Sequence, residues 1–282
     1  MNRKLQARLQ VAFCGLNRSS AREAFPPSRA LTEDLNGRIP GDGFGDVQVP
    51  ARTAELFATA SVDIWRRAVH SFLISASLTK ASPIWAAVCG YYSSHYSVRA
   101  FAHLLGFFLL FSERRVVRWD FHGGVHICSF QKKGGQDREH KLYWNRVKED
   151  EHFETDPIFT RYDPGRDISD VLNRDRANYS DHLSAFYPPF QSLSRDQLKE
   201  RVGFISKIEF QDPPIPDINR FIDLESVQIV AYHRMVKYRQ FLDEILGDTS
   251  RFWNVHRNPS FASGMINFQL VENRGISGLH RT

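Results

Sequence analysis

The stretch GYYSSHYSVRAFAHLLG, which runs from Gly90 to Gly106, decides the fold that we expect for this chain. Apolar and aromatic residues recur in it with the helical period of about 3.6 residues, which predicts an α-helix. A second stripe consists of small residues that lie three or four positions apart, and such residues let the backbone of a neighbouring helix come close. These small residues are Ala86, Gly90, Ser93, Ser97 and Ala100. The stretch therefore predicts one half of a tightly packed helix pair.

The apolar part of this stretch is too short to cross a membrane. It extends from Ala100 to Phe111, which is twelve residues, whereas a membrane-spanning helix needs about 20. Extending it backwards brings in Arg99 and several serines. We therefore expect a helix of a soluble domain, with no membrane as partner.

The segments around the stretch predict its helical partner. Apolar residues with helical spacing indicate a first long helix over about 52–79, and Pro83 begins a second helix that we expect to continue to about Phe111. The short break KASP between them favours an antiparallel helix hairpin. Arg114 and Arg115 follow the second helix, where cations suit its C-terminal dipole.

A β-hairpin is predicted directly after the helix pair, at about 115–131. Apolar and polar residues alternate in RVVRWDFH, and Gly123 and Gly124 form a two-residue turn before VHICSFQ. Alternating strands joined by two glycines are typical of a hairpin. The fold class that we expect is mainly α, a bundle of four to five helices with this hairpin inserted.

The remaining chain is divided by composition. Residues 1–50 are rich in glycine, proline and aspartate towards their end, and we expect them to be weakly ordered. KLYWNRVKEDEHF indicates a short helix, about 167–186 a third long helix, and DINRFIDLESVQIVAYHRMVKYRQFLDEILG a fourth. One helical domain is expected over 51–250, followed by a C-terminal tail over 251–282.

Composition and charge leave the class of partner open. The chain has 282 residues, 42% hydrophobic and 24% charged, which is typical of a soluble globular protein. Its net charge is +5, and 28 of its 37 cations are arginine. Arginine binds phosphate through paired hydrogen bonds, so this charge fits a polyanionic partner, but it also fits an ordinary basic surface.

No cofactor or metal is expected from the cysteines and histidines. Cys14, Cys89 and Cys128 are widely spaced and form no CxxC pair, which argues against a disulfide framework and favours a reducing, cytoplasmic setting. HGGVHIC places His122 and His126 around the hairpin turn near Cys128, but a zinc site needs a fourth ligand. Residues 1–30 are rich in arginine, as in a basic leader or a transit peptide.

The second helix offers a further hypothesis. Tyr92, Tyr96 and Arg99 could form a platform on which nucleic-acid bases stack, although aromatic residues at helical spacing also suit a core. We expect His95 to be a core histidine. We expect His103 and Arg99 to be partly exposed.

Two segments resemble the HEPN superfamily (higher eukaryotes and prokaryotes nucleotide-binding), over roughly 60–110 and 168–186. In the second helix the resemblance rests on Tyr91, Tyr92, Ser93, Ser97, Ala100, Leu104, Leu105 and Gly106. In the later helix it rests on Arg174-x-x-Ala177-Asn178-Tyr179, which is similar to an Arg-x-x-Ala-Asp-Tyr pattern with asparagine in place of aspartate. The hairpin and the long segment after it depart from a minimal member.

The resemblance implies a site on the third helix. Catalytic members are metal-independent ribonucleases, usually dimers, with an arginine and a histidine four to six residues apart, which here are Arg176 and His182. His182 would act as base or acid, Arg174 or Arg176 would stabilise phosphorane charge, and Tyr179 lies between them. Two departures bear on this. Ala177 stands where those members tend to have a polar residue, and residues six apart lie about 120° apart around a helix. A structural network of these residues with Asp170 is the alternative.

Two functions follow as hypotheses. The first is an RNA-binding protein of toxin or defence type, which would be a ribonuclease if it is catalytic. Such a protein would form a homodimer and could bind a protein partner, such as an antitoxin or another system component. The second is a non-catalytic helical module that binds a protein partner or a nucleotide. The third hypothesis is an unrelated helical protein without activity of its own.

Overall fold

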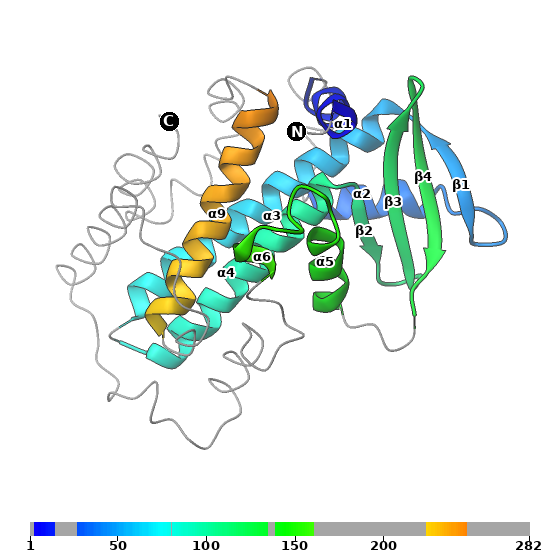
Figure 1. The fold of residues 1–282 in the computed structure, drawn as a ribbon. Coiled ribbons are helices and arrows are strands. Elements are labelled where there is room, and N and C mark those ends of the chain that lie inside the picture. The colour runs from blue at the N-terminus through cyan, green and yellow to red at the C-terminus, as the bar shows by residue number, and fades with distance from the viewer. Residues whose placement is uncertain (1–2, 15–26, 80, 135–138, 161–223, 247–282) are drawn as a thin grey trace. The chain divides into compact units, whose positions relative to one another are not determined.

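The computed structural model describes residues 3–14, 27–79, 81–134, 139–160 and 224–246 (Figure 1). Within these ranges the chain is mostly helical and has one antiparallel sheet of four strands. The described residues divide into two compact units. The first has residues 3–14, 27–67, 96–134, 139–160 and 244–246, and the second has residues 68–79, 81–95 and 224–243. The two long helices, α3 (Ala51–Leu78) and α4 (Pro83–Leu104), each contribute one half to each unit.

The predicted helix pair is confirmed. In the first unit Ser61 Oγ of α3 donates a hydrogen bond of 2.7 Å to the carbonyl oxygen of Ala100 in α4. In the second unit Ser75 Oγ donates one of 2.6 Å to the carbonyl oxygen of Ala86. Both acceptors belong to the small-residue stripe, so the missing side-chain bulk lets a serine of one helix reach the backbone of the other.

The predicted end of the second helix was wrong. Helix α4 ends at Leu104, and Phe107–Leu110 forms strand β2, which pairs with β3 (Arg115–His122). Gly106 has a φ of 73°, a left-handed conformation that ends helices and suits glycine. Its carbonyl oxygen accepts a hydrogen bond of 2.7 Å from the backbone nitrogen of Trp119. The run FFLL is buried throughout, so it lacks the alternation by which a strand is recognised.

The hairpin is confirmed as part of a larger sheet. Strands β3 and β4 (Val125–Lys132) pair from Arg115↔Lys132 to His122↔Val125. The turn glycines, Gly123 and Gly124, have φ values of 59° and 82°, as a two-residue hairpin turn requires. The strand order is β1-β4-β3-β2, with β1 spanning Gly45–Val49. The sequence did not predict β1 or β2, so the sheet has four strands where two were expected.

One face of this sheet forms the core of the first unit. Val117, Trp119, Cys128 and Phe130 are buried on it. Phe57 of α3 stacks on Trp119 with ring centroids 5.8 Å apart and meets Phe108 of β2 edge-on at 6.1 Å. Large aromatic rings thus join the helix pair to the sheet.

The described parts of residues 1–50 contain regular secondary structure. Two helices occur there, α1 (Arg3–Cys14) and α2 (Pro27–Asn36), ahead of strand β1. They bury apolar side chains on one face each: Leu5, Leu9, Ala12 and Phe13 in α1, and Leu31 and Leu35 in α2. Burial of these faces and the pairing of β1 with β4 stabilise the described parts of this segment.

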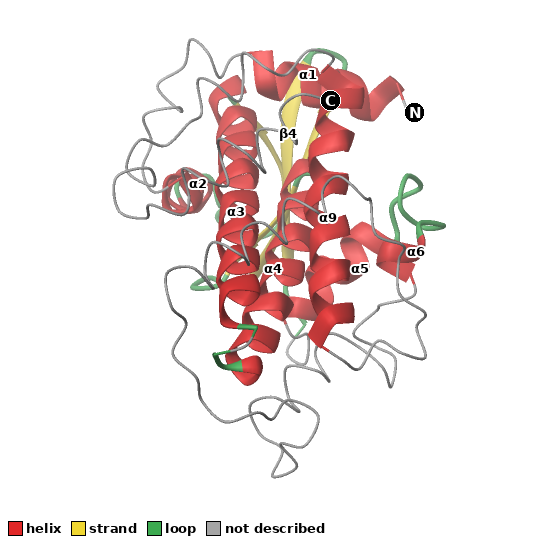
Figure 2. Cartoon of the chain, turned by 90° about the vertical axis from the view of Figure 1, so that its left-hand side faces the viewer, coloured by secondary structure: helices red, strands yellow, loops and turns green. Residues whose placement is uncertain are grey.

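The second unit holds most of α9 (Leu224–Leu246) together with the end of α3 and the start of α4 (Figure 2). Gln228 Nε2 donates to Ser75 Oγ at 3.1 Å and to Thr79 Oγ1 at 2.9 Å. A Cβ atom added to Gly90 would lie 2.8 Å from Val227 Cγ1, so the approach of α9 to α4 requires glycine. Helix α9 confirms the fourth predicted helix over its described part.

Three further predictions concern the rest of the chain. The short helix is confirmed as α5 (Glu139–Lys148), which is followed by α6 (Pro157–Thr160). The third long helix at about 167–186 and the domain boundary at 250 lie outside the described residues. None of the helices in the described ranges has the length and apolar character needed to cross a membrane.

Candidate nucleic-acid interface

The four residues predicted to be catalytic cannot be placed. Arg174, Arg176, Tyr179 and His182 lie outside the described residues. Their convergence, and with it the ribonuclease site, stays a prediction.

Arg99 of the predicted stacking platform on α4 is partly exposed, as expected, and is engaged inside the first unit. Its Nη1 lies 3.3 Å from Glu139 Oε1 of α5, and its guanidinium lies over the ring of Tyr143, 5.2 Å from the centroid. Burial raises the pKa of Glu139, while the Arg99 cation acts in the opposite direction. Arg99 therefore links α4 to α5.

The two histidines of α4 are both buried. His95 packs parallel to the ring of Tyr91, with centroids 6.2 Å apart, which confirms it as a core histidine. His103 was expected to be partly exposed and is fully buried, with its ring 5.1 Å from Phe108 and 5.9 Å from Tyr143. The expectation failed because β2 and α5 cover this end of α4. Burial, and then the nearby Arg99 cation, hold the pKa of His103 well below its ordinary value, although the backbone of Ala60 acts the other way.

This burial predicts that acid destabilises the protein through His103. The depressed pKa means that the unfolded chain binds the proton first, so stability is lost as pH falls below about 6.5, by up to about 1.4 kcal/mol per pH unit. We expect His103→Gln to lose less stability than wild type between pH 7 and pH 5, measured by urea unfolding. His122→Gln, at an exposed position, is the control. Parallel curves for wild type and His103→Gln would refute this account.

The histidines and the cysteine of the hairpin do not converge. Phe121 pairs with His126, and His122 pairs with Val125. Because successive residues of a strand point to opposite faces, His122 and His126 lie on opposite faces of the sheet. Burial raises the pKa of the Cys128 thiol to about 12. Among the described residues, no three histidine, cysteine or acidic side chains are grouped so that they could hold a metal ion.

Basic and aromatic side chains gather instead at one end of the sheet, the lower end in Figure 1. The start of β3 pairs with the end of β2 and the end of β4, as Leu110↔Arg115 and Arg115↔Lys132 show, and β1 begins beside Phe130. Each strand thus ends or begins here. We call the resulting group the strand-end cluster; its members are Phe44, Phe111, Arg114, Arg115, Lys132 and Lys133.

The two phenylalanines of the cluster are unusually exposed. Phe44 is 45% exposed and Phe111 is 48% exposed, and they are two of the three large apolar side chains that the described part of the chain leaves open to solvent. Each has a cation beside its ring. The guanidinium of Arg115 lies 4.6 Å from the centroid of Phe44, and Lys133 Nζ lies 5.7 Å from that of Phe111. Such contacts hold the rings in place without burying them.

The four cations of the cluster keep most of their charge for a partner. In the part of the chain that the structure describes, no carboxylate lies within ion-pair distance of Arg114, Arg115, Lys132 or Lys133. The acidic residues next to the cluster in sequence are Asp42, Asp46 and Glu113. Asp42 Oδ1 accepts a hydrogen bond of 3.1 Å from the backbone of Phe44, and Asp46 Oδ1 accepts one from Ser129 Oγ. The Lys133 cation also acts on Glu139, but among the described residues no direct ion pair neutralises the four cations.

Arg114 has a strained backbone. Its φ of 50° makes it the one residue other than glycine with a positive φ among those described. A side chain in this conformation costs about 1–2 kcal/mol. The carbonyl oxygen of Arg114 accepts a hydrogen bond of 2.8 Å from the backbone nitrogen of Lys133, which fixes the turn against β4. Strain of this kind gathers at functional sites.

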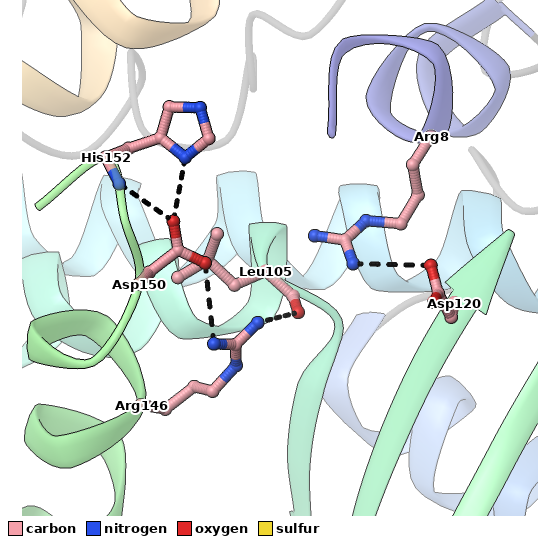
Figure 3. A network of polar contacts seen from close by, with 6 residues as sticks. All are labelled: Arg8, Leu105, Asp120, Arg146, Asp150 and His152. Carbon is pink, nitrogen blue, oxygen red and sulfur yellow. Dashed lines mark hydrogen bonds and ion pairs between the residues drawn. The ribbon is translucent and has the colours of Figure 1, made fainter. Parts of the chain in front are cut away.

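A second polar group lies at the other end of β3 (Figure 3). Arg146 of α5 donates through Nη2 to the carbonyl oxygen of Leu105 at 3.2 Å, and its Nη1 lies 3.4 Å from Asp150 Oδ2. Asp150 Oδ1 lies 2.8 Å from His152 Nδ1. Arg8 of α1 reaches towards the same region, with Nη1 3.7 Å from Asp120 Oδ1 of β3.

The sequence predicted neither group. Arg114 and Arg115 were interpreted as the cap of a helix that in fact ends at Leu104. The one signal that could have found the cluster is the pair of double cations, Arg114–Arg115 and Lys132–Lys133, at equal distances from the hairpin turn. Strand pairing brings such positions together.

Comparison with known proteins assigns the chain to no family. Neither the known protein families, nor the curated proteins, nor the solved structures contain a match to this chain. The resemblance to the HEPN superfamily stays a prediction, and a function must be argued from the chemistry of the described residues.

Proposed function

We propose that this chain binds single-stranded RNA through the strand-end cluster. The observation that carries the proposal is the combination of two half-exposed phenylalanine rings with four cations that no described carboxylate pairs. Proteins that bind single strands stack bases on aromatic rings and follow the backbone with positive charge. The choice of RNA rests on the sequence resemblance.

The arrangement suits a flexible strand better than a rigid duplex. Phe44 belongs to one edge of the sheet and Phe111 to the other, and the cations of β3 and β4 lie between the two. A single strand can place one base on each ring while its phosphates meet the cations between them. In a duplex the bases are already stacked, so the rings would have no face to bind.

Removal of one ring tests the proposal. We expect Phe111→Ala to weaken binding of a labelled single-stranded RNA about fivefold, because stacking of one base on an aromatic ring contributes about 1 kcal/mol or more. Fluorescence anisotropy at fixed salt measures the affinity. Trp85→Ala is the matched control, since Trp85 is 59% exposed and lies outside the cluster.

Two results would contradict the proposal. Equal losses in Phe111→Ala and Trp85→Ala would show that binding does not use the cluster, and absence of binding by wild type would end the proposal. The ribonuclease hypothesis is separate from binding: loss of RNA integrity without metal, in wild type and not in His182→Ala, would support it.

A further inference from the structure

The polar group of Figure 3 holds more buried donor capacity than its partners use. Arginine presents several N–H donors in a planar fork. Arg8 is only 9% exposed, yet its contact with Asp120 is a loose ion pair of 3.7 Å, and its Nε is buried without a hydrogen-bond partner among the described residues. The Nε atom of Arg146 is also buried without a hydrogen-bond partner. Buried donors of this kind are normally satisfied.

The nearby carboxylates do not satisfy these donors. Asp150 is held by His152, whose ring nitrogen and backbone nitrogen lie 2.8 and 3.3 Å from the same carboxylate oxygen. Its other oxygen reaches Arg146 only at 3.4 Å. Asp120 is 45% exposed, so water competes for it. These two carboxylates, together with Glu149, which also acts on Arg146, reduce the positive charge of the group but leave the Nε donor of each guanidinium without a partner.

The two buried guanidiniums come from separate elements, α1 and α5. Figure 3 shows Arg8 of α1 directed towards the region occupied by Arg146 and Asp150. Burial lowers the pKa of both arginines. The Asp120 carboxylate raises the pKa of Arg8 and the Asp150 carboxylate that of Arg146, while the Arg146 cation lowers the pKa of Arg8 and the Arg118 cation of β3 lowers that of Arg146. Arg118 shares a strand face with Asp120 and is exposed. The cations repel one another, and the carboxylates Asp120 and Asp150 act against this repulsion.

We propose that Arg8, Arg118 and Arg146 together bind a phosphomonoester group. A phosphate dianion offers several oxygens to the forks of two or three guanidiniums, and such contacts are among the strongest hydrogen bonds in proteins. Arg8 and Arg146 would supply the buried side of this site and Arg118 the solvent side. The site shares no residue with the strand-end cluster, although Arg118 lies three residues along β3 from Arg115. It does not depend on the proposed function.

Calorimetric titration of the full chain with adenosine monophosphate, inorganic phosphate and adenosine tests this inference at constant ionic strength. Both phosphate compounds should bind, and adenosine should not. We expect Arg118→Gln to weaken binding about tenfold, since it removes one charge-assisted contact at an exposed position where folding is not endangered. Arg8→Lys keeps the charge but loses the fork, and should weaken binding by a similar factor. Arg67→Gln, an exposed cation of α3, is the control.

A comparison of RNA ends distinguishes the two sources of such a phosphate. An RNA with a 5′-phosphate that binds more tightly than the same RNA with a 5′-hydroxyl, and loses this advantage in Arg118→Gln, identifies an RNA end as ligand. Equal binding of the two RNAs, with binding of adenosine monophosphate, identifies a free nucleotide. No binding of either phosphate compound by wild type, or unchanged binding in both Arg118→Gln and Arg8→Lys, would overturn the inference.

Discussion

Gly106→Ala is expected to destabilise the protein by about 3 kcal/mol or more. Its φ of 73° costs an alanine about 1–2 kcal/mol. A Cβ atom at this position would also collide with the backbone carbonyl oxygen of Trp119, which cannot move aside because it belongs to strand β3. Gly106 lies between the end of α4 and the start of β2, so the collision would occur at the junction between the helix pair and the sheet.

Thermal unfolding followed by circular dichroism measures this effect. A loss of 3 kcal/mol lowers the midpoint by roughly 6–12 °C in a chain of this size. Gly123→Ala is the matched control, because Gly123 also has a positive φ, of 59°, and nothing lies within 4 Å of its added Cβ. It should lose about 1 kcal/mol. Equal midpoints for the two variants would show that the contact of Gly106 with Trp119 is not as close as described.

Removal of three cations from the strand-end cluster is expected to weaken RNA binding about 100-fold at 0.1 M salt. In single strands each phosphate contact contributes about 0.7 to the slope of log affinity against log salt, which is about 0.7 log units per contact at 0.1 M. The triple variant is Arg114→Gly/Lys132→Gln/Lys133→Gln. Arg115 is kept because its guanidinium fills the space beside Gly43 and Phe44.

This variant should bind poorly and still fold. Glycine accepts the backbone conformation of Arg114, so the change at this position removes strain. The thermal midpoint should therefore stay near that of wild type. The control is Arg29→Gln/Arg52→Gln/Arg67→Gln, which removes the same charge from exposed positions elsewhere. If the control loses as much affinity as the cluster variant, net charge and not the cluster governs binding.

The helices and the hairpin could be predicted because their signals are local. Helices α3 and α4 follow from periodicity and from Pro83, and the β3–β4 turn follows from Gly123 and Gly124. Strand β2 could not be predicted, because FFLL is buried throughout and continues the apolar run of α4. Strand β1 depends on pairing with a strand about 80 residues later, which no local pattern records.

The candidate site could not be predicted from the sequence for the same reason. Phe44, Phe111, Lys133 and Arg114 are far apart or separated by the hairpin, and only strand register brings them to one end of the sheet. The sequence predicts a helix that continues to Phe111 and ends near Arg114 and Arg115, whereas Phe107–Leu110 is strand β2. The error in one element thus hid the site built on the next.

The salt dependence of RNA affinity tests the central claim most directly. Anisotropy titrations of one single-stranded RNA at four salt concentrations give the slope of log affinity against log salt for wild type and for the triple cluster variant. The account predicts a slope for the variant that is shallower by about 2, which corresponds to three lost phosphate contacts. Equal slopes for the two proteins, or the same reduction in the Arg29/Arg52/Arg67 control, would contradict it.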